Sequence, residues 1–171
     1  MSCKRVFLVG FMCSGKSTVG RLLADMLGWQ FVDIDKEVER IEKMSIPEIF
    51  KIKGEDYFRK RELEVLTELV KGEGLVISTG GGLGSNSQAM ELMKSSGLVV
   101  WLRVAFETFL ERCGKDPSRP LLRKSKEDLL KLFESRSKIY GKAHLELDGT
   151  IDPSLLAKDI IHACRNYTFT L

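Results

Sequence analysis

The chain has 171 residues, of which 43% are hydrophobic and 30% charged, with 27 Lys and Arg against 24 Asp and Glu residues. This composition predicts one soluble globular domain over residues 1–171, and the net charge of +3 is too small to indicate a nucleic-acid or membrane surface. No apolar run is long enough for a transmembrane helix, and no signal-peptide pattern precedes residue 5. We therefore expect a cytoplasmic protein whose partners are small molecules.

Short apolar runs alternate with helical periodicities along the chain. We expect strands at residues 5–9, 30–32, 75–78, 98–102 and 146–147. We expect helices at residues 16–27, 35–43, 46–53, 55–70, 87–94, 105–112, 127–143 and 153–164. Ser45 with Glu48 has the pattern of a capping box, and Ser125 is the expected cap of the helix that follows it. This alternation predicts an α/β fold with a parallel sheet covered on both faces, in which ligands bind at the carboxyl ends of the strands.

The segment from Gly10 to Ser17, GFMCSGKS, matches the phosphate-loop pattern GxxxxGK[ST]. It lies between an expected strand and an expected helix, which is the context that the motif requires. Backbone N–H groups of such a loop face a phosphate, Lys16 reaches the β- and γ-phosphates, and Ser17 offers a hydroxyl to Mg²⁺. The sequence therefore predicts ATP and magnesium binding. Cys13 occupies a variable position of the loop, and we interpret it as filler in preference to a redox switch.

Two carboxylates, Asp33 and Asp35, stand at the end of the second expected strand. Alternation along an extended chain puts both on one side. Beside a phosphate loop, one could hold a magnesium-bound water while the other orients or deprotonates an attacking hydroxyl. The alternative is that either residue only caps the helix that follows; the neighbouring loop favours the functional interpretation.

Three arginines and a glycine triplet are further candidates. Arg59 has Glu62 one turn later as a partner, Arg136 lies one turn before Tyr140, and Arg119 lies in a polar segment with the character of a flap. Taken singly, each arginine also fits a solvated surface residue. The triplet 80–82 follows the third expected strand, and we interpret it as backbone that a ligand approaches closely, in preference to a flexible turn.

The four cysteines, at positions 3, 13, 113 and 164, form no CxxC pair. We expect them to be reduced thiols, as in most cytosolic proteins. The two histidines, His144 and His162, lie far from every motif, and we expect surface or packing roles for them.

The motifs GFMCSGKST, FVDID, FRKRE, STGGG and RPLL, together with the late Arg136, occur in the order and spacing of shikimate kinases. The chain resembles that family over nearly its whole length. The resemblance implies a P-loop NTPase-type three-layer sandwich with a five-stranded parallel sheet, a helical substrate-binding region at about 34–62 and a mobile lid at about 113–125. It also implies a monomer that transfers the ATP γ-phosphate to the 3-hydroxyl of shikimate, in the biosynthesis of aromatic amino acids.

Site residues follow from the resemblance position by position. The expected catalytic residues are Lys16, Asp35 and Arg119. The expected ATP-binding residues are Gly10, Cys13, Ser14, Gly15, Lys16, Ser17, Thr18, Arg112, Arg119 and Pro153, with Arg112 and Pro153 flanking adenine. The expected shikimate-binding residues are Asp35, Arg59, Gly80, Gly81, Gly82 and Arg136, and the expected magnesium contacts are Ser17 directly and Asp33 through water. One departure is Thr150-Ile151-Asp152 before Pro153, where many members of the family have a basic residue.

Two other functions compete with this one. Another small-molecule P-loop kinase, for gluconate or a nucleoside monophosphate, would share the loop, but the Arg59 and Arg136 pair with the glycine triplet argues against it. An ATP-binding regulatory module without turnover would not need Lys16, Ser17, Asp33 and Asp35 intact.

Overall fold

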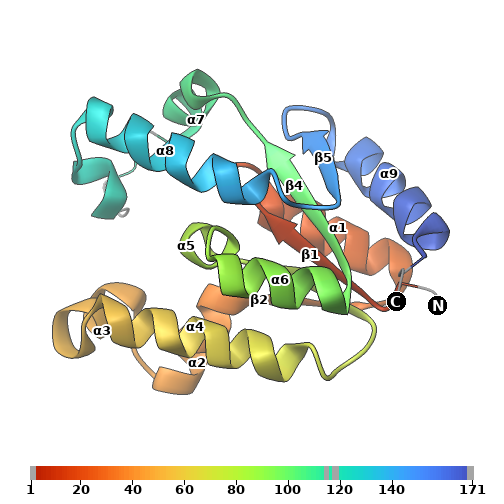
Figure 1. Cartoon of the computed structure of the whole chain (residues 1–171), viewed down its shortest axis with the longest axis horizontal. Helices are drawn as coiled ribbons and strands as arrows, with labels where there is room; N and C mark the ends of the chain where they lie inside the picture. Colours follow the sequence, from red (N-terminus) through yellow and green to blue (C-terminus); the bar gives the residue numbers. More distant parts are fainter. Residues whose placement is uncertain (1–2, 114–115, 117–119, 169–171) are drawn as a thin grey trace.

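The computed structural model describes residues 3–113, 116 and 120–168. Its centre is a five-stranded sheet in the order β2-β3-β1-β4-β5, with every neighbouring pair parallel. The strands are β1 (Arg5–Val9), β2 (Gln30–Asp33), β3 (Leu75–Ser78), β4 (Leu98–Arg103) and β5 (Leu145–Asp148). The predicted α/β class and the five-stranded parallel sheet are thus confirmed (Figure 1).

Helices cover both faces of the sheet. They are α1 (Lys16–Leu27), α2 (Ile34–Glu42), α3 (Ile46–Lys53), α4 (Glu55–Leu69), α5 (Gly81–Gly84), α6 (Ser87–Ser96), α7 (Phe106–Cys113), α8 (Lys126–Tyr140) and α9 (Pro153–Asn166). A 3₁₀ turn spans Pro120–Arg123. Helix α9 packs along α1, and α5 packs between α4 and α8 (Figure 1).

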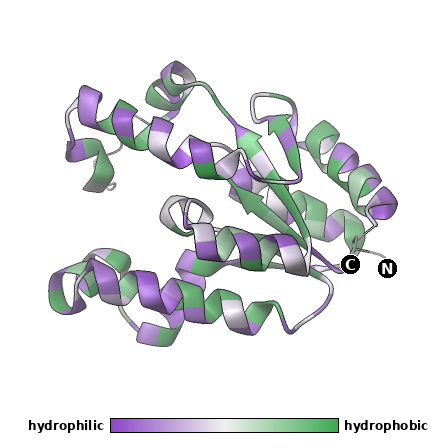
Figure 2. Cartoon of the chain, in the orientation of Figure 1, coloured by the Kyte–Doolittle hydropathy of each residue, from purple (hydrophilic) through white to green (hydrophobic). Residues whose placement is uncertain are grey.

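The alternation of side chains along β1 divides the core into two clusters. Phe7 and Val9 belong to the cluster under α4, α6 and α8, whereas Val6 and Leu8 belong to the cluster under α1 and α9. All four side chains are fully buried, because a parallel sheet between two helix layers leaves neither face to solvent. In Figure 2 the central strands are coloured as hydrophobic along most of their length.

Most expected elements differ from the observed ones by only one to three residues at either end. The capping box of α3 is present in full, with Ser45 Oγ accepting from the Glu48 N–H at 3.3 Å and Glu48 accepting from the Ser45 N–H at 2.9 Å. The larger differences are α5, a short helix over the glycine triplet, and the 3₁₀ turn in the expected lid, neither of which has a sequence periodicity to reveal it. No helix in the described part of the chain has the length and apolar character to span a membrane.

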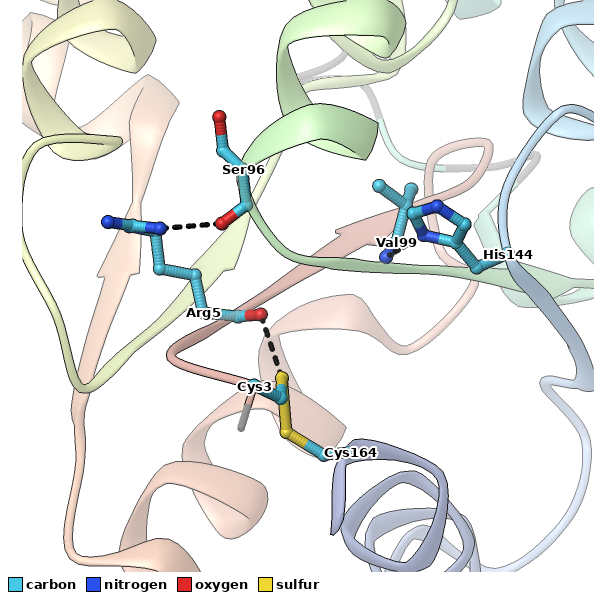
Figure 3. Close-up of a disulfide and its surroundings, with 6 residues drawn as sticks. All are labelled: Cys3, Arg5, Ser96, Val99, His144 and Cys164. Carbon is cyan, nitrogen blue, oxygen red and sulfur yellow. Dashed lines mark hydrogen bonds between the residues drawn. A yellow bond between two sulfur atoms is a disulfide. The ribbon is translucent and has the colours of Figure 1, made fainter. Parts of the chain in front are cut away.

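The expectation of reduced thiols is wrong, because the fold brings the four cysteines together as two disulfides. Cys3 is bonded to Cys164, with their Cα atoms 5.3 Å apart, and Cys13 is bonded to Cys113, with their Cα atoms 6.2 Å apart. The first joins the segment just before β1 to the end of α9 (Figure 3). The partners are 161 and 100 residues apart, so no local spacing in the sequence indicates either pairing.

The histidines lie as expected. His162 is exposed on α9. His144 is half-buried beside β4, where its Nδ1 accepts from the Val99 N–H at 3.0 Å and its Nε2 lies 2.7 Å from Tyr167 Oη. Figure 3 shows the His144 ring against Val99, which is a packing role and not a catalytic one.

Candidate active site

The phosphate loop connects β1 to α1 in a conformation that depends on its glycines. Gly10 has φ +151°, and a Cβ there would lie 2.7 Å from the Leu102 carbonyl oxygen and 2.8 Å from Ser14 Oγ. Gly15 has φ +92° with open space at its missing Cβ. Lys16 Nζ donates to the carbonyls of Gly10 and Phe11, at 2.6 and 3.0 Å, so the ammonium lies over the curve of the loop.

The N-terminus of α1 faces the same space, and no acidic side chain of its first turn offsets the partial positive charge of the helix dipole there. Gly15 is the N-cap and offers no side-chain acceptor, and no acidic residue occurs in the first turn. The first backbone N–H groups of a helix and its dipole then favour an anion. Together with the Lys16 ammonium, this end of α1 is suited to phosphate groups.

The two aspartates at the end of β2 have different local roles. Asp33 is the N-cap of α2, since its Oδ1 accepts from the N–H groups of Asp35 and Lys36 at 3.0 and 3.3 Å. The capping role therefore holds for Asp33, which also faces the phosphate-loop cavity. Asp35 belongs to the first turn of α2 and makes no such cap, so its carboxylate is available for another purpose.

Asp35 lies beside a second buried carboxyl group, that of Glu62 on α4. A Cβ on Gly80 would lie 2.6 Å from Asp35 Oδ1 and 2.8 Å from Glu62 Oε1, so only glycine leaves room where the two oxygens converge. Apart from the contact between the two carboxyl groups themselves, no group among the described residues donates a hydrogen bond to either oxygen. The pair thus places two buried carboxyl oxygens together beside Gly80, and of the two acidic residues Asp35 lines the cavity.

The surroundings raise the pKa of both carboxyl groups. Burial and, after it, repulsion from Asp35 raise the pKa of Glu62 to about 8, although Arg59 acts to lower it. Burial also raises the pKa of Asp35 above 3.8, with repulsion from Asp33 adding to it, while a hydrogen bond from Glu62 and the charges of Lys16 and Arg59 lower it. A carboxylate of raised pKa is a stronger base than an ordinary aspartate.

Two arginines approach the glycine triplet from opposite helices. Arg59 on α4 donates to Glu62 at 2.8 Å and to Glu55 at 3.2 Å, which confirms the expected partnership with Glu62. Its Nη1 lies 2.2 Å from where a Cβ on Gly82 would be. Arg136 on α8 lies with Nη1 3.0 Å from the corresponding point on Gly81. Because these glycines have no side chains, two guanidinium groups can lie directly against the backbone of the triplet.

Arg136 is half-buried, and this burial lowers the pKa of its guanidinium group. The Arg136 guanidinium lies 5.7 Å from the centre of the Phe11 ring. One turn later, the fully buried Tyr140 donates from Oη to the Gly81 carbonyl at 2.6 Å. This bond ties α8 to the start of α5, so Arg136 and the triplet are held as one unit.

The phosphate loop, β2 and β3 enclose a cavity of about 460 Å³ at the carboxyl ends of the strands. Its lining combines the loop, the two aspartates and the glycine triplet: Met12, Cys13, Ser14, Gly15, Lys16, Ser17, Thr18, Asp33, Asp35, Lys36, Glu39, Ile46, Ser78, Thr79, Gly80 and Gly81. Most of the expected site residues are therefore gathered in one place. The sequence patterns did not point to Met12, Lys36, Glu39 or Ile46, which come from variable positions of the loop and from the helices after β2.

Other expected residues lie at the margin or elsewhere. Arg112, at the end of α7, donates to the Cys13 carbonyl at 3.2 Å and to the Gly149 carbonyl at 3.4 Å. It thereby joins the phosphate loop to the loop that leads to Pro153, the first residue of α9. Asp152, where the family often has a basic residue, caps α9 by accepting from the Ser154 N–H at 2.9 Å. Arg119 lies outside the described residues.

Glu62 is a functional candidate that the structure adds. The sequence motifs indicated it only as a partner of Arg59. Its side chain is wholly buried, and a charged residue is almost never buried so completely without a partner or a purpose. The sequence signal was its helical spacing, three residues after Arg59. The second neighbour, Asp35, comes from another helix and becomes visible only in the fold.

Comparison with known proteins agrees with this geometry. The family model for shikimate kinase matches residues 12–165. Shikimate kinase from Aquifex aeolicus is 51% identical over 157 residues, covering 92% of this chain and 94% of that protein. Its crystal structure superposes with a TM-score of 0.87 over 93% of this chain and 95% of that one. Shikimate kinase from Acinetobacter baumannii, solved in complex with shikimate, is 38% identical, with a TM-score of 0.86 over 94% of this chain and 92% of that one. The chain therefore belongs to the shikimate kinase family.

Proposed function

We propose that this chain transfers the γ-phosphate of ATP to the 3-hydroxyl of shikimate, giving shikimate 3-phosphate and ADP. One observation carries the proposal: a single cavity joins the phosphate loop to Asp35, and two arginines adjoin the glycine triplet at its edge. This arrangement would put a phosphoryl donor site and an acceptor site for a carboxylate-bearing alcohol side by side. A kinase that positions two substrates in this way needs little covalent chemistry of its own.

The donor half consists of the loop from Gly10 to Thr18. Its N–H groups and the start of α1 would hold the phosphates of ATP, and Lys16 would neutralise charge on the transferring group. Ser17 and Asp33 fit a magnesium ion, since both offer oxygen to the cavity and Mg²⁺ takes few protein ligands, with phosphates and waters completing its shell. When bound, the ion would neutralise charge on the phosphates. Arg112 and Pro153 would flank adenine.

The acceptor half consists of Asp35, Arg59, Gly80, Gly81, Gly82 and Arg136. The two arginines would bind the shikimate carboxylate, because a guanidinium matches a carboxylate in a two-bond fork. Backbone of the triplet would meet the ring hydroxyls. Asp35 would orient the reacting hydroxyl and accept its proton.

The remaining assignments belong to the same proposal. Residues 34–62 would form the substrate-binding region and residues 113–125 the lid, with Arg119 contacting the phosphoryl group on closure. We propose a monomer in the cytoplasm, where ATP is available.

The decisive experiment offers shikimate, gluconate and AMP in parallel and measures ADP release. We expect release with shikimate alone. ADP formed only with gluconate or AMP would place the chain's activity elsewhere among the P-loop kinases. Comparison of Arg136→Lys with Arg40→Lys then tests the acceptor site, because Arg40 is exposed on α2 and, within the described part of the chain, pairs with Glu37 alone. We expect the first to weaken shikimate binding about tenfold and the second to leave it unchanged.

A further inference from the structure

The Cys13–Cys113 disulfide lies at the nucleotide end of the cavity, and the loop pattern alone gives Cys13 no role. Cys13 is half-buried and lines the cavity, whereas Cys113 at the end of α7 is 4% exposed. The bond therefore connects a residue of the phosphate loop to a helix that begins 93 positions later in the chain (106 against 13).

Helix α7, which carries Cys113, also contacts the phosphate loop through other residues. Phe109, one turn before Cys113, is buried and packs edge-on against Phe11 of the loop, with ring centres 4.9 Å apart. Arg112 donates to the carbonyl of Cys13 itself. The last turn of α7 thus contacts the phosphate loop through three residues, and the disulfide is the only covalent one of these contacts.

The backbone of Cys13 explains why a tether matters at this position. Cys13 has φ +60°, and among the described residues only Lys43 shares such a positive φ without being glycine. A side chain in this left-handed region costs about 1 kcal/mol or more. The loop needs this conformation to turn its N–H groups toward a phosphate, so an anchor on Cys13 keeps the binding-competent conformation populated.

We propose that Cys13–Cys113 is a thiol–disulfide exchange site that sets the nucleotide affinity of the phosphate loop. With the disulfide closed, the loop is pre-organised and the ordering cost of binding is small. With the two thiols reduced, Cys13 is held by the Arg112 contact and packing alone, and nucleotide binding weakens. Disulfides in cytosolic proteins are often transient and redox-sensing, which agrees with a bond placed at a ligand site. The inference rests on the proposed function in one respect, namely nucleotide binding at this loop.

The reductant would be a dithiol, and the exchange balances in two steps. A thiolate of the dithiol attacks Cys13 Sγ, the more accessible sulfur, and Cys113 Sγ leaves as a thiolate. The second thiol of the reductant, as a thiolate, then attacks the reductant sulfur that is bonded to Cys13. This closes the disulfide of the reductant and releases Cys13 as a thiolate. The dithiol is oxidised to a disulfide by loss of two electrons, and its two protons end on the two cysteine thiols.

Coupling between two equilibria is reciprocal, so a nucleotide should also protect this disulfide. The remote Cys3–Cys164 disulfide provides a control within the same molecule, because it joins β1 and α9 at the amino end of the sheet (Figure 3). Reduction by dithiothreitol, followed by alkylation and peptide mass spectrometry, gives the rate for each bond separately. We expect Mg·ADP to slow reduction of Cys13–Cys113 about threefold or more and to leave Cys3–Cys164 unaffected.

Calorimetric titration with Mg·ADP measures the same coupling from the other side. We expect reduced wild type and the Cys113→Ser variant to bind ADP about threefold or more weakly than oxidised wild type. The Cys3→Ser/Cys164→Ser variant should bind as oxidised wild type does and should still respond to reductant. If Cys113→Ser proves unstable, reduction of the Cys3→Ser/Cys164→Ser variant breaks the same bond without any change at residue 113.

Two results would overturn the inference in different ways. Equal ADP affinity before and after verified reduction of Cys13–Cys113 would remove its regulatory role and leave the proposed kinase function intact. Absence of ADP binding in both states would contradict the proposed function and this inference together.

Discussion

At the scale of single residues, the proposed acceptor chemistry assigns the reacting hydroxyl to Asp35. Phosphoryl transfer passes through a loose transition state, so the hydroxyl gains little from early loss of its proton, and orientation should matter at least as much as basicity. Asp35→Asn keeps one acceptor oxygen, whereas Asp35→Ala removes both. We expect each variant to lose about a hundredfold or more in single-turnover rate, with Asn clearly faster than Ala. ATP binding, measured separately, should be retained in both.

The outcomes of this comparison separate two roles. Equal loss in the two variants would identify Asp35 as mainly a base. Full activity of Asp35→Ala would remove Asp35 from the mechanism.

The raised pKa of Glu62 predicts how stability changes with pH. Its value in the folded chain, about 8, lies above its ordinary value of 4.5, so between these pH values the folded chain holds a proton that the unfolded chain has lost. The stabilisation is fully present below pH 4.5 and is lost as the pH rises through 8, with a limiting slope of about 1.4 kcal/mol per pH unit. Urea denaturation of Glu62→Gln across this range should show a flatter decline than wild type.

The matched control is Glu68→Gln, an exposed change on the same helix. It should keep the wild-type dependence on pH. A decline in Glu62→Gln as steep as that of wild type would show that other groups carry the titration.

At the scale of helices and strands, Glu42 joins the three helices of the expected substrate-binding region. Its carboxylate, on the last residue of α2, accepts from Lys53 Nζ at 2.6 Å, Tyr57 Oη at 2.9 Å and Arg61 Nε at 2.7 Å. These donors stand on α3 and α4. Because α4 also carries Arg59, the contacts of Glu42 help to place an arginine that we propose to bind the acceptor.

Replacement of Glu42 by Gln should loosen this group of helices. We expect amide hydrogen exchange over residues 46–62 to become faster by about fivefold, since three charge-assisted bonds weaken together. The matched change Glu37→Gln, on the same helix, removes an exposed pair with Arg40 and should have little effect. Equal acceleration in both variants would mean that loss of charge on α2, and not the bridge, is responsible.

The sequence predicted the five strands and the helices other than α5 well, because each of these has a local signal. The capping box at Ser45 and the apolar alternation of β1 are examples, and the phosphate loop and Asp33-Ile-Asp35 have fixed spacings that carry their chemistry. Helix α5, the Asp35–Glu62 pair and both disulfides arise from contacts between distant segments. Glycine triplets have no helical periodicity, and cysteines 100 residues apart carry no spacing rule, so the fold itself was needed to find them.

At the scale of the whole molecule, the two disulfides act on opposite ends of the sheet. Cys13–Cys113 lies beyond the carboxyl end of β1, where the cavity opens, and Cys3–Cys164 lies at the amino end of that strand, where α9 ends. The sulfur of Cys3 also lies 3.2 Å from the Arg5 carbonyl. The two disulfides should therefore have different effects. We connect Cys13–Cys113 to nucleotide affinity, whereas Cys3–Cys164 should affect stability alone.

The last prediction concerns that second bond. Cys3–Cys164 closes a loop of 161 residues, nearly the whole chain, and the loss of loop entropy in the unfolded state gives it a stabilisation of up to about 5 kcal/mol. We expect the Cys3→Ser/Cys164→Ser variant to melt about 10 °C below oxidised wild type in scanning calorimetry. Reductant should lower the melting temperature of wild type more than that of the variant, because only wild type still has this bond to lose. Equal melting temperatures of variant and oxidised wild type would mean that the packing of α9 on α1 already holds the two ends together, and that the disulfide adds no stability to the fold.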